Sequence, residues 1–134
     1  MAKESPSLDA WMREAKADPT AAQCGMYLAH NGVVRVTPKA EVRGVETGGV
    51  QPGERVTTLS FGYDQDKVDA AIAAARAMPG IFYVRVWLNE GELSVGDDIM
   101  YVLVGGDIRP HVIEALQTLV GTLKNECVTE VEHA

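Results

Sequence analysis

The stretch that decides the fold is Gly91-Glu92-Leu93-Ser94-Val95-Gly96-Asp97-Asp98, which leads into the apolar run Ile99-Met100-Tyr101-Val102-Leu103-Val104. The glycines predict tight turns, and six apolar residues have the length of a buried strand. Arg109-Pro110 then opens a helix that we expect to close at Lys124, because proline is favoured in the first helical turn. An arginine and a lysine therefore lie at opposite ends of one helix, in a frame that can hold a small anion.

The other elements follow from hydrophobic periodicity. A helix capped by Ser7 and ending near Asp18-Pro19 has apolar residues at helical spacing, as does an alanine-rich helix over 66–78. Three further strands are predicted, over 25–36, 55–63 and 81–88. The signal His30-Asn31-Gly32 predicts a turn or bulge in the first of them. The order α, β, β, α, β, β, α indicates an α+β fold, a two-layer sandwich of mostly antiparallel strands with about three helices.

Residues 37–55 are rich in glycine and proline and carry Lys39, Arg43 and Arg55, which is typical of a mobile loop within a domain. A chain of 134 residues with 46% hydrophobic content matches a single domain over 1–134. The strands over 81–88 and 99–104 carry more apolar surface than three short helices cover. A homodimer is therefore favoured over a monomer with a small core.

Composition excludes several classes of function. The net charge of −7 argues against binding to nucleic acid or to an anionic membrane. The chain has neither a long apolar run nor an apolar N-terminal signal, so we expect a cytoplasmic protein. Cys24 and Cys127 lie far apart and are expected to be free thiols. We predict no metal, because metal-ligand spacing is missing among the histidines His30, His111 and His133, and we also predict no cofactor.

Two patches resemble the large, catalytic subunit of molybdopterin synthase, the MoaE family. The first is Gly91-Glu92-Leu93-x-x-Gly96-Asp97, followed by an apolar strand, Arg109, an amphipathic helix and Leu123-Lys124. The second, Gly32-Val33-Val34-Arg35, is similar to the family's Gly-x-Val-Arg strand end, and the loop after it occurs where the family also has one. The resemblance covers about residues 25–126 and implies a MoaE-like fold of the α/β-hammerhead type.

The resemblance also implies an activity and partners. Enzymes of this family convert cyclic pyranopterin monophosphate to molybdopterin, in molybdenum cofactor biosynthesis. They take sulfur from the C-terminal thiocarboxylate of a small ubiquitin-like, MoaD-like subunit that ends in Gly-Gly. The expected protein is thus a sulfur-transferring enzyme, a homodimer that forms a heterotetramer with its small subunits. Lys124 is the position that matches the family's lysine that assists the chemistry.

The residue types fit that chemistry. Arg35 and Arg109 can grip the oxygens of the cyclic phosphate, because guanidinium offers planar, bidentate geometry. If Lys124 is desolvated near cationic neighbours, its pKa is lowered and it can serve as acid and base while sulfur replaces oxygen. His111, one turn into the same helix, is a candidate stand-in for a lost polar group at the substrate.

The sequence also departs from the family pattern. The family's second active-site lysine falls at Val131 by counting, and its histidine before the helix-opening arginine falls at Ile108. Neither side chain can transfer a proton. One alternative is therefore a catalytically weakened relative that binds a pterin or a ubiquitin-like partner without turnover. Another is an unrelated homodimeric structural or interaction module, which would require the Gly-x-Leu-x-x-Gly turn to be a coincidence. For single residues, the helix macrodipole alone can explain Lys124, and a surface ion pair can explain Arg35.

Overall fold

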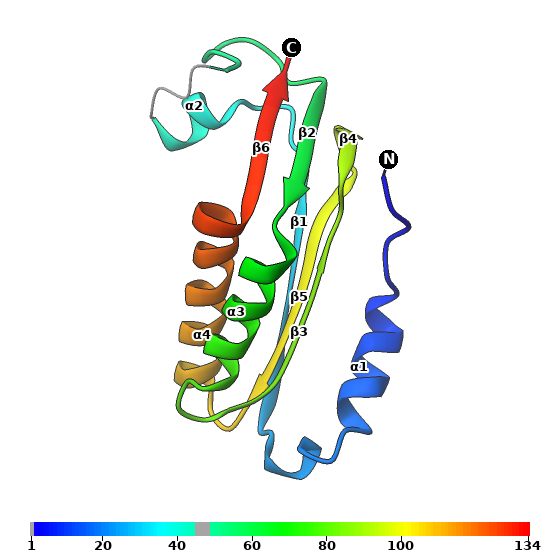
Figure 1. The fold of residues 1–134 in the computed structure, drawn as a ribbon, viewed down its shortest axis with the longest axis vertical. Helices are drawn as coiled ribbons and strands as arrows, with labels where there is room; N and C mark the ends of the chain where they lie inside the picture. The colour runs from blue at the N-terminus through cyan, green and yellow to red at the C-terminus, as the bar shows by residue number, and fades with distance from the viewer. Residues whose placement is uncertain (1, 45–48) are drawn as a thin grey trace.

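Two three-stranded antiparallel sheets form the frame of the protein in its computed structural model, which describes residues 2–44 and 49–134 (Figure 1). The larger sheet has the order β1 (Met26–Val33), β5 (Asp98–Gly106), β3 (Ile81–Leu88). The smaller has the order β4 (Gly91–Ser94), β2 (Thr58–Tyr63), β6 (Val128–His133). The predicted α+β class with antiparallel strands is confirmed.

Helices cover both faces of the larger sheet. On one face lie α3 (Gln65–Arg76) and α4 (Arg109–Thr122), and on the other lies α1 (Leu8–Lys16) (Figure 1). Side-chain oxygens cap the N-termini of two of these helices. Ser7 accepts a hydrogen bond from the backbone N–H of Ala10 in α1, and Asp64 accepts hydrogen bonds from two backbone N–H groups in α3. The chain also has a 3₁₀ turn (Ala21–Gln23) and a short helix α2 (Lys39–Arg43).

The central strand β5 is buried on both faces. Val102 and Val104 pack with α3 and α4, whereas Leu103 points the other way and packs with Trp11 and Ala15 of α1. A strand covered on both sides is apolar without alternation. This explains the continuous run over 99–104 from which the fold was predicted.

The end of α4 sets the path of the last strand. After Thr122 the helix widens into a π turn, Leu123–Cys127, whose first and last side chains are buried. The chain then reverses into β6, which pairs with β2 so that Glu130 lies opposite Phe61. The helix thus ends before Lys124, and the π turn places Lys124 beside the smaller sheet.

Four details differ from the sequence-based expectation. Strand β6 was not predicted, because two of its three inward positions, Glu130 and Glu132, carry acids and only Val128 is apolar. The expected loop over 37–55 contains α2, and its residues 45–48 lie outside the described residues. The strand predicted from Arg55 begins at Thr58. Strand β1 runs through His30-Asn31-Gly32 without a turn, whereas the bulge that these residues also predicted is confirmed by a register irregularity between Gly32 and Val33.

Candidate functional site

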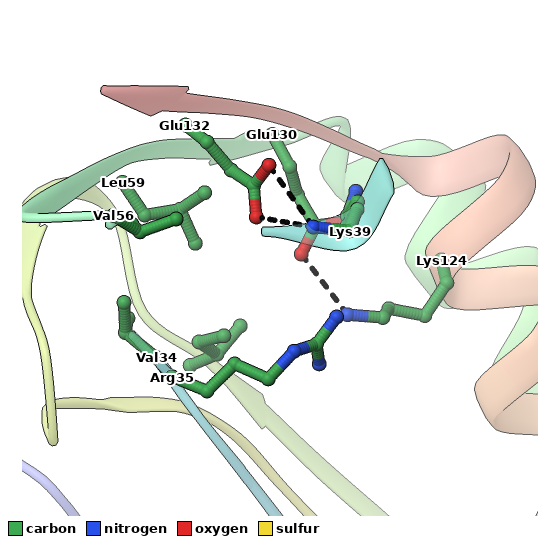
Figure 2. A pocket seen from close by; sticks show the side chains of 9 residues that line it. Val34, Arg35, Lys39, Val56, Leu59, Lys124, Glu130 and Glu132 are labelled. Carbon is green, nitrogen blue, oxygen red and sulfur yellow. Dashed lines mark hydrogen bonds and ion pairs between the residues drawn. The ribbon is translucent and has the colours of Figure 1, made fainter. Parts of the chain in front are cut away.

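A charged pocket lies where β6 leaves the end of α4 (Figure 2). It spans about 310 Å³, its open mouth included. Its apolar floor comes from both sheets and the segments beside them, from Val34, Val56, Leu59 and Ile99. Its polar wall consists of Arg35, Lys39, Lys124, Glu130 and Glu132. Three cations and two carboxylates give this Lys124 pocket an excess of one positive charge.

A nearly buried carboxylate joins two of the cations. The Glu130 side chain is only 5% exposed, and its two oxygens accept hydrogen bonds from different lysines. Lys39 Nζ lies 2.6 Å from Oε2, and Lys124 Nζ lies 3.0 Å from Oε1. Burial alone would raise the pKa of Glu130, but the hydrogen bond from Lys39 and the charge of Lys124 outweigh it and hold the pKa below its ordinary value.

The second carboxylate anchors α2. Both oxygens of Glu132 accept the backbone N–H of Lys39, at 3.2 and 3.0 Å. The first residue of a helix has no intrahelical partner for its N–H, and the residue before α2, Pro38, offers no side-chain cap. Glu132, on the neighbouring strand β6, therefore supplies the hydrogen-bond acceptor that the first N–H of α2 lacks. This contact fixes where the Lys39 side chain enters the pocket.

Arg35 completes the wall. Its Nε donates to the backbone carbonyl of Thr37 at 3.1 Å, which orients the guanidinium along the pocket (Figure 2). Within residues 2–44 and 49–134, no carboxylate forms an ion pair with it. The surface ion pair considered from the sequence is thus not found there. Among the described residues, the other N–H groups of Arg35 have no acceptor and can bind an anion.

The structure brings together only two of the predicted site residues. Arg35 and Lys124 line the same pocket. Arg109 and His111 lie at the other end of α4, roughly 20 Å away for a helix of this length. There His111 Nδ1 pairs with Asp107 Oδ1 at 2.7 Å, and this hydrogen bond lowers the pKa of Asp107. Arg109 is exposed.

The environment of Lys124 differs from the expected one. The group in contact with its ammonium is a carboxylate, not a cation. The cation Lys39 lies on the other oxygen of that carboxylate. Lys124 in turn acts on His30 of β1: burial lowers the pKa of His30, and the charge of Lys124 lowers it further, which favours the neutral imidazole.

Three residues of the wall were not predicted as site residues: Lys39, Glu130 and Glu132. Lys39 and Glu130 are separated by 91 positions, so no local spacing connects them. Val131, where the family's second lysine falls by counting, is 53% exposed and alternates with Glu130 and Glu132 along β6. Its side chain therefore lies on the opposite face of the strand from the pocket.

The two cysteines, Cys24 and Cys127, are free thiols, as predicted. Cys127 is buried at the end of the π turn, and burial together with the nearby charge of Glu126 raises the pKa of its thiol. A reactive cysteine is instead exposed and has a lowered pKa. Cys127 therefore lacks the features of a sulfur-carrying nucleophile.

In the described part of the chain, no cluster of three or more histidine, cysteine, aspartate or glutamate side chains is placed to hold a metal ion. None of the helices described is long and apolar enough to cross a membrane.

The model of one protein family, the MoaE protein, matches residues 1–126 of the sequence. The chain belongs to the MoaE family. No curated protein matches the sequence. Among solved structures, the molybdopterin synthase of Staphylococcus aureus matches with a TM-score of 0.71 at 16% identity, covering 96% of this chain and 85% of that one.

Two other solved structures share the MoaE fold. The molybdopterin cofactor biosynthesis protein E of Burkholderia multivorans has a TM-score of 0.70 at 18% identity, with 96% and 81% of the two chains covered. A complex of subunits 1 and 2 of the molybdopterin-converting factor of Helicobacter pylori has a TM-score of 0.64 at 15% identity, with 93% and 74% covered. Identities this low mark a divergent MoaE protein.

Proposed function

We propose that this protein acts in molybdenum cofactor biosynthesis as the large subunit of a molybdopterin synthase. In this reaction sulfur passes from the C-terminal thiocarboxylate of a small ubiquitin-like subunit to cyclic pyranopterin monophosphate. Membership of the MoaE family supports the pathway. The complex of two subunits in the Helicobacter pylori relative supports a small-subunit partner.

The observation that carries the proposal is the shared pocket of Lys124 and Arg35. These residues belong to the two separate sequence patches that resemble the family, and the fold brings them to one wall. Both the cyclic phosphate and the thiocarboxylate are anions, and the pocket has an excess of positive charge. Arg35 is the residue we expect to hold phosphate oxygens, because its guanidinium has unused donors.

Lys124 is the residue we expect to move protons. When a carbon–sulfur bond replaces a carbon–oxygen bond on the substrate, the departing oxygen needs a proton, and an ammonium 3.0 Å from a carboxylate can be oriented to give one. Arg109 and His111 cannot reach this pocket within their own chain. In a homodimer they would have to reach it from the second chain.

The test is product formation. The protein is mixed with a thiocarboxylated small subunit and cyclic pyranopterin monophosphate, and the dithiolene product is measured. We expect Lys124→Ala to lower the rate by about 10²–10⁴-fold, the usual contribution of a general acid or base. Lys16→Ala, which changes an exposed lysine on α1, is the matched control and should leave the rate unchanged. An unchanged rate in Lys124→Ala would place the chemistry elsewhere.

One observation favours a second candidate, a relative that binds the small subunit without turnover. The positions that count to the family's second lysine and histidine, Val131 and Ile108, carry apolar side chains that are 53% and 51% exposed. Neither can donate a proton. Tight binding of the small subunit with no dithiolene product from the wild-type protein would favour this candidate over the enzyme.

A further inference from the structure

The Lys124 pocket contains a lysine that the sequence did not single out as functional. Lys39, at the start of α2, lies in hydrogen-bond contact with the same carboxylate as Lys124. Both lysine side chains are 24% exposed, whereas the Glu130 side chain between them is 5% exposed. The carboxylate is therefore covered and the two ammonium groups remain accessible from the pocket.

Each ammonium group has donors to spare. An ammonium carries three N–H groups, and in the part of the chain described Glu130 is the sole hydrogen-bond acceptor for Lys39 Nζ and for Lys124 Nζ. Two donors on each group are thus left for a ligand. An oxyanion with two or more oxygens can take one hydrogen bond from each, and Arg35 lines the same pocket.

The contacts around Lys39 also explain how it is held. Glu132 fixes the backbone of Lys39 and Glu130 fixes its ammonium, so two carboxylates of one strand determine both ends of the residue. A flexible lysine loses side-chain entropy when it is ordered on a ligand. Here much of that ordering has already taken place before a ligand arrives.

We propose that Lys39 is a second substrate-holding cation of the Lys124 pocket, and that Glu130 is the internal counter-ion that sets the two ammonium groups as a paired oxyanion site. For the identity of the substrate this inference rests on the proposed function. The oxyanion is either the phosphate of the substrate or the C-terminal carboxylate-like group of the small subunit. Both present negatively charged oxygens that two ammonium groups can bind.

Inorganic phosphate is the first probe. Its binding is followed by nuclear magnetic resonance through the His30 imidazole, because the charge of Lys124 acts on this ring. We expect Lys39→Met to weaken phosphate binding about 10- to 100-fold, the range for a lost hydrogen bond to a charged group. Arg43→Met, at the exposed far end of α2, is the matched control and should bind as the wild type does.

A second pair of variants separates ligand binding from a purely structural role. Lys39→Met alone leaves Glu130 with one partner and is expected to lower the melting temperature. In a Glu130→Gln background that penalty disappears, because no charge is left to neutralise. If Lys39 holds the ligand, adding Lys39→Met to Glu130→Gln still weakens phosphate binding. Equal binding by Glu130→Gln and the double variant would overturn the inference.

Glu130→Gln alone gives the opposite sign. The glutamine amide still has an oxygen that can orient an ammonium group, but the negative charge that repels phosphate is gone, so phosphate should bind more tightly than to the wild type. Weaker binding, or no saturable phosphate shift in the wild type, would also overturn the inference.

The same variants distinguish this inference from the proposed function. Loss of dithiolene product in Lys39→Met, with the small subunit still bound, supports both. The comparison runs again with a peptide ending in Gly-Gly in place of phosphate. A Lys39 effect confined to the peptide assigns the oxyanion to the small-subunit tail. If the wild-type protein makes no product but Lys39→Met still weakens phosphate binding, the proposed enzyme activity is refuted and the paired oxyanion site is retained.

Discussion

The two ends of α4 carry similar charges in very different settings. At the N-terminal end, Arg109 is exposed and His111 pairs with Asp107, four residues away on the same segment. At the C-terminal end, Lys124 shares the carboxylate of Glu130 with Lys39, a residue from a distant part of the chain. From the sequence alone, Arg109 and Lys124 are both candidate site residues. The difference teaches that a cation becomes part of a site when the fold provides a buried counter-charge and an enclosing wall.

The largest effect is expected when the two ends are tested together. Lys124→Ala and Arg109→Ala should each reduce dithiolene formation, the first more severely. If Arg109 acts in the pocket of the second chain of a homodimer, a mixed dimer of the two variants has one intact pocket. We therefore expect mixing and re-association to restore activity. Verified mixed dimers that stay inactive would show that the ends of α4 do not cooperate across chains.

The second expected difference between the two ends of α4 is the free energy of unfolding that is lost when an ion pair at each end is broken. Lys39→Met removes one partner of the nearly buried Glu130 carboxylate, at an expected cost of about 1–3 kcal/mol in the free energy of unfolding. His111→Ala breaks an ion pair whose two side chains are more than a third exposed, which is worth about 0–1 kcal/mol. Urea denaturation measures both. Equal costs for the two variants would contradict the comparison.

At acidic pH the protein should lose the stability that the ionised Glu130 carboxylate contributes near the C-terminal end of α4. Its pKa in the folded protein lies below the unfolded value, so its contribution to stability is fully present above about pH 4.3, the ordinary glutamate pKa, and is lost as the pH falls through the folded pKa. Glu130→Gln removes this contribution and should flatten the stability curve in that window. Unfolding curves at a series of pH values test this, and a Glu130→Gln curve as steep as the wild type would exclude the effect.

The smallest predicted effect is a shift in one histidine. Lys124→Met removes a nearby positive charge and should raise the pKa of His30, although burial still holds it below the ordinary value. Arg109→Met, at the far end of α4, should leave the His30 titration unchanged. The ring signals of His30 over a pH series report both. A shift of the same size in both variants would mean that His30 does not sense the pocket.

Much of the fold could be predicted from the sequence because it depends on local patterns. Ser7 as a cap and Pro110 in the first helical turn mark helices, and the run over 99–104 marks a strand buried on both faces. The β6 strand escapes prediction, because only Val128 among the three inward positions of Val128–His133 is apolar, and the other two, Glu130 and Glu132, carry acids.

The candidate site was predicted only in part for a related reason. Arg35 and Lys124 belong to patches that resemble the family, so each could be singled out by itself. The partnership of Lys39 with Glu130 depends on how α2 and β6 meet, which is a long-range contact. Arg109 could be singled out just as well as Lys124, but helix length alone keeps it from the pocket.

Strand β6 points Glu130 and Glu132 to the pocket and Val131 to the outer surface. Side chains alternate with a period of two, so a slip of one residue exchanges the whole set. A single-codon insertion or deletion between the π turn and Glu130 would put Val131 against the lysines and leave both ammonium groups without a counter-charge. A length change of one residue at the start of β6 would therefore need a compensating bulge to keep both glutamates facing the pocket.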